Sequence, residues 1–386
     1  MNQIIALKGL SPGSSTAYAA PSRPQDAAIT TEIRLLSACG EIRQAWTELA
    51  ARAIESNLFF EPDFALAAAQ HLIAFRDAAV LLAWQGPVGS PQRRLLGLIP
   101  CFPRNRLFVP DELIGFSDRR IFNGAPLLDA AQAQAVLAAV LSLRQGWVLE
   151  GRGLVLRQID MASPLIAPIR RAAETLGLGT TLIPANLPIP LRHGAPTPSD
   201  IEAMRHALAQ RGKLELVEAT SRTELRDAVE ILLAMEASGP KGRAGKAVLQ
   251  DTREVGFLRA MTRALACSRQ SRVALLTLDG RPIAGALVIG RAKGGWLYMA
   301  AQDESEAPFF PGQVLFPEQV LLALMRQAAP ERTILQPAPA TSGPGAVSFG
   351  EIRLSPRVTR KPRDLAGRAR AALRRGLRLP PARAAG

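Results

Sequence analysis

The chain contains 386 residues, of which 48 % are hydrophobic, and its formal net charge is +14 at pH 7. This length accommodates two domains with a large core, and the composition excludes an intrinsically disordered protein. No apolar run approaches the ~20 residues that a helix needs to cross a bilayer, so no membrane-spanning helix is expected.

The positive charge is concentrated in the C-terminal segment. Residues 353–386 contain eleven Arg and Lys but one acid, Asp364, which gives this segment +10 and leaves about +4 for the rest. Residues 361–386 are therefore predicted to be a basic tail, with a helix over 363–377. Two interpretations stay open: a tail in contact with an anionic membrane, at ~1 kcal/mol per cation near the surface, and a solvated tail. Nucleic-acid binding is not expected, because no aromatic residue alternates with the arginines.

Cysteine and histidine are few. No C-x-x-C spacing predicts a disulfide framework or a zinc site, so we expect no metal and a reducing, cytoplasmic location. The cysteines are Cys39, Cys101 and Cys267. Residues 1–28 lack the long apolar run of a secretory signal and are predicted to be a flexible tail.

Hydrophobic periodicity predicts a first α/β unit over residues 29–195. In chain order we expect a strand over 32–36, helices over 42–53 and 64–76, a hairpin of 80–84 with 95–100, a helix over 130–143, a strand over 153–159, a helix over 164–176 and an extended segment over 180–191. The last of these contains three prolines, which suit the edge of a sheet and not its centre.

Residues 196–360 show a similar order of elements. We expect helices over 199–211, 223–236 and 252–266, strands over 214–218, 273–278, 283–289 and 296–301, a helix beginning near 313, a strand over 333–336 and a last strand pair over 347–358. The repeated order predicts a duplicated fold of two α/β domains, each a mixed, mostly antiparallel sheet flanked by helices.

The centre of the second unit is an antiparallel meander. Asp279-Gly280 is a strong hairpin signal, because both central positions of a type I′ turn need positive φ. The strand over 296–301 leads through an acidic loop to the helix that begins near Gln313. Free N–H groups at a helix start favour an anion, and Gly312 lets the backbone approach it closely.

Four segments resemble the GNAT acyltransferase superfamily, in its FemAB-like and CelD-like bacterial branch. They are Trp46-Thr47-Glu48-Leu49 with Phe59-Phe60-Glu61-Pro62, then E-A-S-G-P-K-G-R-A-G over 236–245, L-D-G-R-P-I-A-G over 278–285 and F-P-G-Q-V-L over 310–315. The segment over 236–245 is the most specific, whereas the hairpin alone occurs in many unrelated proteins. The resemblance spans roughly residues 30–340, and it implies tandem GNAT-like domains.

The resemblance also implies transfer of an acyl group from acetyl-CoA or another acyl-CoA to an amine or hydroxyl. The acceptor would be a small molecule or a saccharide related to envelope polysaccharide. The donor would lie along the third strand of the meander and at the start of the next helix. The donor-binding residues would then be Met299, Ala300, Ala301, Pro311, Gly312, Gln313 and Val314.

Three residues are candidates for the chemistry. Glu236 and Asp303 could act as general base, and Tyr298 could protonate the leaving thiolate. The plainer alternatives are a helix-end carboxylate, an exposed loop acid and a packed tyrosine. Acceptor-binding candidates are Ser238, Lys241 and Arg243. Cations among glycines suit an anion, although a solvated hinge loop has the same composition.

Two other functions remain open. Some relatives transfer an aminoacyl group from charged tRNA, so this reaction is an alternative. The chain could also be a non-catalytic accessory protein of polysaccharide assembly at the membrane surface. The acidic loop before Gly312, and the single glycine in its phosphate-binding segment, favour that second alternative, because acidic charge opposes a polyanion.

Overall fold

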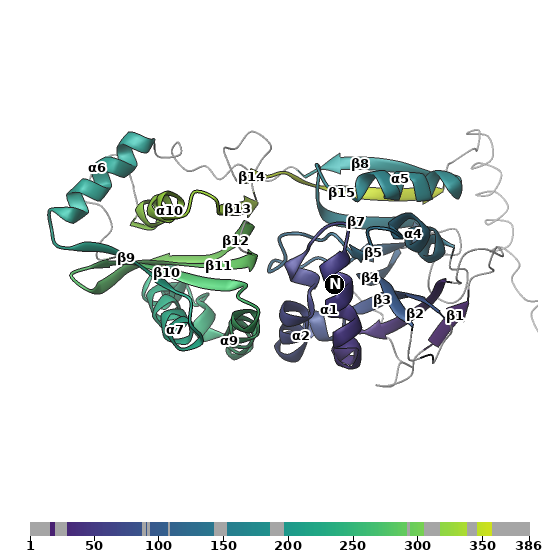
Figure 1. Ribbon diagram of the computed structural model, residues 1–386, viewed down its shortest axis with the longest axis horizontal. Coiled ribbons are helices and arrows are strands. Elements are labelled where there is room, and N and C mark those ends of the chain that lie inside the picture. The colour runs from purple at the N-terminus through teal and green to yellow at the C-terminus, as the bar shows by residue number, and fades with distance from the viewer. Residues whose placement is uncertain are drawn as a thin grey trace, which may run out of the picture.

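A computed structural model describes residues 16–19, 29–86, 90, 93–106, 109–142, 153–185, 197–291, 294–304, 317–337 and 346–356. Within these ranges the chain forms one sheet of nine strands and one of six, both mixed and both flanked by helices (Figure 1). The predicted α/β class with two mostly antiparallel sheets is confirmed. None of the helices in the described ranges has the length and apolar character needed to cross a membrane.

The N-terminal sheet has the strand order β1-β2-β3-β4-β5-β7-β15-β8, with β6 beside β4. Its strands are β1 Thr16–Ala19, β2 Ile29–Leu35, β3 Ala79–Gln85, β4 Arg94–Arg106, β5 Val109–Gly115, β6 Leu127–Leu128, β7 Gly153–Asp160, β8 Leu178–Pro184 and β15 Phe349–Pro356. The predicted hairpin of β3 and β4 is confirmed by their antiparallel register.

Helices cover both faces of this sheet. One layer contains 3-10 turns at Leu36–Ile42 and Leu58–Phe60 with α1 Arg43–Arg52, α2 Pro62–His71 and α3 Ile73–Arg76, and the other contains α4 Ala133–Leu141 and α5 Ile166–Thr175. Strand β3 is buried almost throughout because Val80 and Leu82 face the first layer while Leu81 faces the second. Coverage of both faces explains its continuous apolar sequence.

The C-terminal sheet has the strand order β14-β13-β12-β11-β10-β9. Its strands are β9 Leu214–Ala219, β10 Ser271–Leu278, β11 Arg281–Arg291, β12 Gly294–Gln302, β13 Thr333–Pro337 and β14 Ala346–Val347. The predicted turn at Asp279-Gly280 is confirmed, since these residues have φ of 50° and 78° and join β10 to β11. The meander is therefore encoded locally.

Two helix layers sandwich the C-terminal sheet, as Figure 1 shows above and below it. One layer contains α6 Pro198–Ala209 and α10 Pro317–Ala328, and the other contains α7 Arg222–Ser238, α8 Pro240–Arg243, a 3-10 turn at Val248–Gln250 and α9 Thr252–Cys267. In β10, Leu276 packs with the first layer, whereas Val273 and Leu275 pack with the second.

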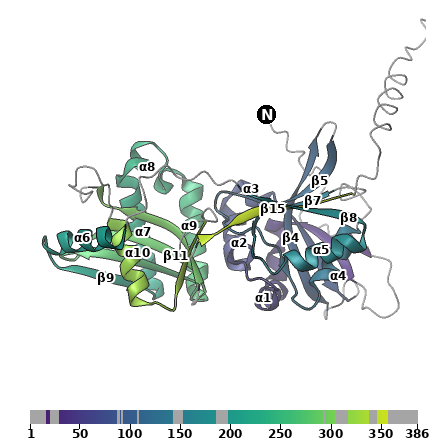
Figure 2. The ribbon, with the colours of Figure 1, turned by 90° about the horizontal axis from the view of Figure 1, so that it is seen from above.

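The last strand, β15, returns to the N-terminal sheet. It pairs antiparallel with β7 on one side, from Phe349 opposite Asp160, and with β8 on the other, from Gly350 opposite Pro184 (Figures 1 and 2). The domain boundaries predicted from the sequence, 196–360, assigned this strand to the C-terminal domain. In the structure it belongs to the N-terminal sheet instead. The apolar residues Ile352 and Leu354, each 1 % exposed, complete the core beside β7.

One hydrophobic core spans both domains. Phe59 of the N-terminal domain packs on Trp296 of β12 with ring centroids 5.9 Å apart, and Phe64 packs on Phe257 of α9 at 5.4 Å. Helix α2 lies against α9 across this interface. The Trp-x-x-Leu and Phe-Phe segments of the sequence therefore form core, and Trp46, which is fully buried, donates its indole N–H to the carbonyl of Phe60 at 2.8 Å.

Candidate functional site

Strand β12 contains a β-bulge at its centre. In its pairing with β11, Leu287 lies opposite Met299 and Val288 lies opposite Leu297, so that Tyr298 is an extra residue. A bulge leaves the extra residue outside the regular ladder and bends the strand. The backbone around Tyr298 is thereby displaced from regular sheet geometry.

The opposite edge of β12 separates from its neighbour β13. These strands pair in parallel at three positions, from Gly294 opposite Thr333 to Trp296 opposite Leu335. Beyond this point Gln336 and Pro337 of β13 have no pairing partner on β12, and they pair with β14 on the other edge of β13. β12 and β13 therefore diverge just before Tyr298, and the bulge and the divergence coincide on β12.

A cleft of about 1180 Å³ lies at this bulge. Its walls come from β12, the end of α7, the start of α9 with the segment before it, and a loop of the N-terminal domain. The lining residues are Arg119, Arg120, Phe122, Glu236, Lys241, Gly245, Lys246, Ala247, Val248, Gln250, Asp251, Thr252, Arg253, Glu254, Phe257, Leu258, Tyr298, Met299 and Ala300. A second hollow of about 710 Å³, between α6, β9 and α10, contains none of the predicted site residues.

Tyr298 lies in the wall of the cleft. Its ring packs against Phe122 and Phe64 of the N-terminal domain, with centroids 5.7 Å and 6.1 Å away. Burial raises the pKa of the Tyr298 hydroxyl far above its ordinary value, and the nearby cation Arg120 only partly opposes this. The hydroxyl has no hydrogen-bond partner in the part of the chain that the structure describes. It is a protonated donor beside the cleft.

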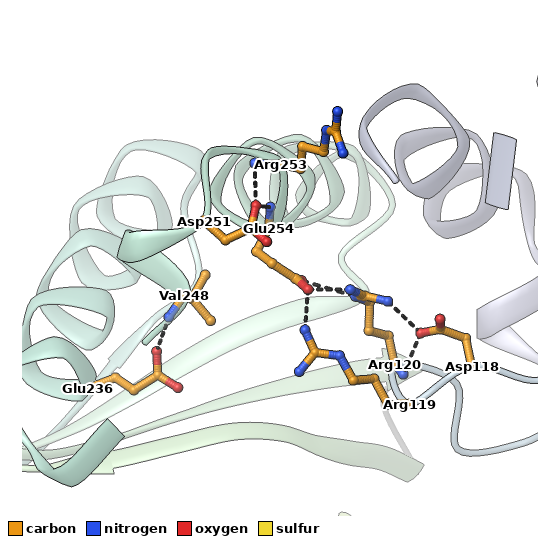
Figure 3. A network of polar contacts seen from close by, with 8 residues as sticks. All are labelled: Asp118, Arg119, Arg120, Glu236, Val248, Asp251, Arg253 and Glu254. Atoms are coloured by element: carbon orange, nitrogen blue, oxygen red, sulfur yellow. Dashed lines mark hydrogen bonds and ion pairs between the residues drawn. The ribbon is translucent and has the colours of Figure 1, made fainter. Parts of the chain in front are cut away.

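Glu236 sits at the end of α7 with a side chain that is 5 % exposed. Its Oε1 accepts a hydrogen bond from Nζ of Lys241 at 2.7 Å. Its Oε2 accepts one from the backbone N–H of Val248 at 2.9 Å, which Figure 3 shows. A carboxylate has about four acceptor positions, so each oxygen retains one. The geometry holds the carboxylate in the cleft wall and still allows it to accept a proton.

The segment over 236–245 is more compact than the loop predicted from its glycines. Pro240–Arg243 form the helical turn α8, and a Cβ on Gly242 would lie 1.6 Å from the carbonyl oxygen of Ala237. Arg243 pairs with Glu304 at 2.6 Å, and Ser238 donates to the carbonyl of Met235 at 2.8 Å. Both predicted cations, Lys241 and Arg243, therefore have acidic partners within the chain.

The remaining predicted residues divide into three groups. Met299 and Ala300 line the cleft, whereas Ala301 is buried and does not line it. Asp303 pairs with Arg281 at 3.0 Å near the hairpin and does not line it either. The predicted phosphate-binding residues Pro311, Gly312, Gln313 and Val314, and the basic tail over 361–386, lie outside the described residues.

The N-terminal domain contributes residues that the sequence did not indicate. Nε of Arg120 donates to Oε2 of Glu254 at 3.0 Å, and its Nη1 donates to Asp118 at 2.7 Å (Figure 3). Arg119 also donates to Glu254. Burial alone would raise the pKa of Glu254, but the hydrogen bond from Arg120 and the charges of Arg120 and Arg119 outweigh it and lower that pKa. Glu254 is therefore an ionised anchor.

Residues 197–329 match the family model "Acetyltransferase (GNAT) domain". A search of curated proteins finds no match to the sequence.

Among solved structures, FemX matches at 10 % identity and a TM-score of 0.44, over 81 % of this chain and 95 % of that chain. The C-terminal domain (DUF2156) of a putative lysylphosphatidylglycerol synthetase from Agrobacterium fabrum matches at 14 % identity and 0.39, over 72 % and 85 %. A tandem GNAT protein from the clavulanic acid biosynthesis pathway matches at 13 % identity and 0.35, over 86 % and 100 %. The family model covers the domain in which β12 is bulged and separates from β13, so residues 197–329 are similar to a GNAT acetyltransferase domain.

Proposed function

We propose that the protein transfers an acyl group from an acyl-CoA thioester to an amine or hydroxyl acceptor in the cleft beside Tyr298. The observation that carries this proposal is the coincidence, on β12, of the bulge, the divergence from β13 and the cleft wall. A displaced strand next to an open cleft can present backbone N–H groups to a reacting carbonyl, which is the requirement of an oxyanion-stabilising site.

The transfer begins with the thioester carbonyl against a backbone N–H of β12 near Met299 and Ala300. The acceptor nitrogen or oxygen attacks the carbonyl carbon, and negative charge develops on the carbonyl oxygen as the new bond forms. Collapse of this tetrahedral species breaks the carbon–sulfur bond and releases CoA as its thiolate. Backbone donors that are fixed before the reaction stabilise the developing charge without reorganisation.

Two protons move during this reaction. Glu236, which is held by Lys241 and by the N–H of Val248, takes the proton from the acceptor directly or through a water. Tyr298 gives its proton to the thiolate, because its hydroxyl lies in the cleft wall and has no other hydrogen-bond partner among the described residues. The tyrosine then recovers a proton from Glu236 or solvent, so the enzyme returns to its starting state.

Calorimetric titration of the full-length protein with acetyl-CoA tests the proposal. Ala300 lines the cleft, so Ala300→Trp should weaken acetyl-CoA binding at least 10-fold. Ala203, which is exposed on α6, supplies the matched control, and Ala203→Trp should bind like the wild type. Absence of binding to the wild type, or equal binding by both variants, would contradict the donor site.

Release of free CoA thiol tests the assignment of the base. Glu236→Gln keeps the shape of the side chain and the acceptor for Val248 but removes the basic carboxylate. We expect kcat to fall about 10²–10⁴-fold while acetyl-CoA still binds. An unchanged kcat would exclude Glu236 as the base.

A further inference from the structure

We infer that the acceptor carries an anionic group, a carboxylate or a phosphate, next to its nucleophile, and that Arg119 and Lys246 bind this group. The inference rests on the proposed function in one respect: it takes the cleft to be the place where the acceptor binds. It adds the chemical class of the acceptor, which neither the fold nor the family determines.

The charges of the cleft are unbalanced. Its lining contains five basic and three acidic side chains, a net +2. Lys241 is neutralised by Glu236, and Arg120 is held by Asp118 and Glu254. Lys246 and Arg253 are exposed and have no ion pair among the residues that the structure describes. Cations that line a cleft and have no acidic partner favour an anionic ligand.

Arg119 is the third cation and comes from the other domain. Its side chain is 74 % exposed, and Nη2 alone donates to Glu254. A guanidinium has five N–H donors in a fixed plane, so most of them remain available to the cleft. The N–H donors of the Arg119 guanidinium that do not contact Glu254 suit bidentate binding of a carboxylate or phosphate.

The N-terminal loop that carries Arg119 is firmly held. The N–H of Gly124 donates to the carbonyl of Gln158 on β7, and the Gln158 amide donates to the carbonyl of Ile121, both at 2.8 Å. A Cβ on Gly124 would lie 2.1 Å from the carbonyl oxygen of Arg157, so the loop is packed tightly on the strand. A preorganised loop loses little entropy when an anion binds.

These cations lie on the acceptor side of the sheet. The CoA pyrophosphate would meet the start of the helix that follows β12, and this helix, α10, packs with α6 on one face. Lys246 lies between α8 and the 3-10 turn at Val248–Gln250, and Arg253 lies in the first turn of α9. These elements cover the opposite face of the sheet, where α7 and α9 pack (Figure 1). The two faces are separated by the sheet, so the donor phosphates and these cations are assigned to different groups.

Inorganic phosphate is a suitable probe for the anion site, with saturating CoA present to occupy the donor site and chloride added to keep the ionic strength constant. We expect phosphate to raise the unfolding midpoint of the full-length wild type in a saturable way. Arg119→Ala should weaken this response at least 10-fold, and Lys246→Ala, at an exposed position that should tolerate truncation, at least threefold. Arg226→Ala is the control, because Arg226 is an exposed arginine on α7 outside the cleft.

Three outcomes would overturn the inference or separate it from the proposed function. A wild type without a saturable response, or Arg119→Ala and Lys246→Ala proteins that respond like the wild type, would remove the anion site. If Arg119→Ala weakens acetyl-CoA binding 10-fold and CoA abolishes the phosphate response, the cations serve the donor and the inference fails. If acetyl-CoA does not bind the wild type but phosphate binding depends on Arg119, the proposed function fails and the anion site stands.

Discussion

Arg120 and Glu254 join the two domains across the cleft, with Nε of the arginine 3.0 Å from Oε2 of the carboxylate. The arginine follows β5 in the N-terminal domain and the glutamate lies in the first turn of α9. Their side chains are 18 % and 11 % exposed. The cleft is therefore a composite of both domains, and the N-terminal domain forms part of its wall.

This ion pair should make the folded protein less stable at acid pH. The pKa of Glu254 is below its ordinary value of 4.5 in the folded protein, so its stabilising contribution is complete above pH 4.5 and is lost as the pH falls below it. Glu254→Gln should cost about 1–3 kcal/mol at pH 7 and should flatten that acid loss. Urea unfolding between pH 3 and pH 7 measures both effects. A variant with the acid dependence of the wild type would contradict the prediction.

Glu55 should have the opposite effect on stability, which it should lower as the pH rises. Burial raises its pKa above 4.5, more than the hydrogen bonds from Ser163 and Asn123 lower it. The folded state therefore favours protonated Glu55, and this contribution is present below pH 4.5 and lost as the pH rises through the raised value. Glu55→Gln should not show this loss, so its stability relative to the wild type should rise from pH 4.5 upward. The exposed residue Glu48 supplies a control, Glu48→Gln, and equal pH profiles for both variants would refute the role of Glu55.

Tyr298→Phe removes a hydroxyl and keeps the ring that packs on Phe64 and Phe122. If this hydroxyl protonates the leaving thiolate, kcat for acyl transfer should fall about 10²–10⁴-fold, while the Kd for acetyl-CoA should change less than twofold. Thiol release and calorimetry measure the two quantities. The sequence contains one other tyrosine, and Tyr18→Phe serves as the control. A Tyr298→Phe enzyme with wild-type kcat would exclude the role.

Gly242→Ala tests the packing of α8 against α7. The new Cβ would lie 1.6 Å from the carbonyl oxygen of Ala237, so the turn must move and carry Lys241 away from Glu236. We expect a loss of about 1–3 kcal/mol in the free energy of unfolding. Gly40→Ala is the control, because no atom lies within 4 Å of its new Cβ and a change within about 0.5 kcal/mol is expected. Equal stability of both variants would show that α8 adapts.

Ile352→Ala tests whether β15 stabilises the N-terminal sheet and not the C-terminal sheet. Ile352 is 1 % exposed in the core beside β7, so its truncation should cost about 2–5 kcal/mol. Hydrogen exchange should become faster in β7 and β8 and not in the C-terminal sheet. Ile334→Ala on β13 is the matched variant and should affect the C-terminal sheet instead. Faster exchange of β9–β13 in Ile352→Ala would contradict the observed topology.

Local sequence signals were sufficient for most elements of the fold. The Asp279-Gly280 turn needs only the φ preferences of two neighbouring residues, and the buried strands β3 and β10 follow from their apolar runs. The placement of Tyr298, Met299 and Glu236 in one cleft followed from the resemblance, because motif spacing specifies which residues a shared fold brings together.

Long-range partners were not predictable in the same way. Arg119 and Arg120 lie in a turn-rich stretch with no local feature that indicates Glu254, which is more than 130 positions away. The glycines of 236–245 suggested either an anion-binding loop or a solvated hinge loop, whereas Gly242 is required by the close approach of Ala237. Likewise, nothing in the sequence of β15 distinguishes a strand of one sheet from a strand of the other.

The return of β15 has a consequence for synthesis of the protein on the ribosome. β7 and β8 are not neighbours in the sheet until β15 lies between them, and β15 is translated only after the whole C-terminal domain. During elongation the edges of these two strands therefore stay unpaired, as sites where a nascent chain can aggregate. A premature stop codon near residue 345 should thus destabilise the N-terminal domain, and the first half of the gene should not yield a folded fragment.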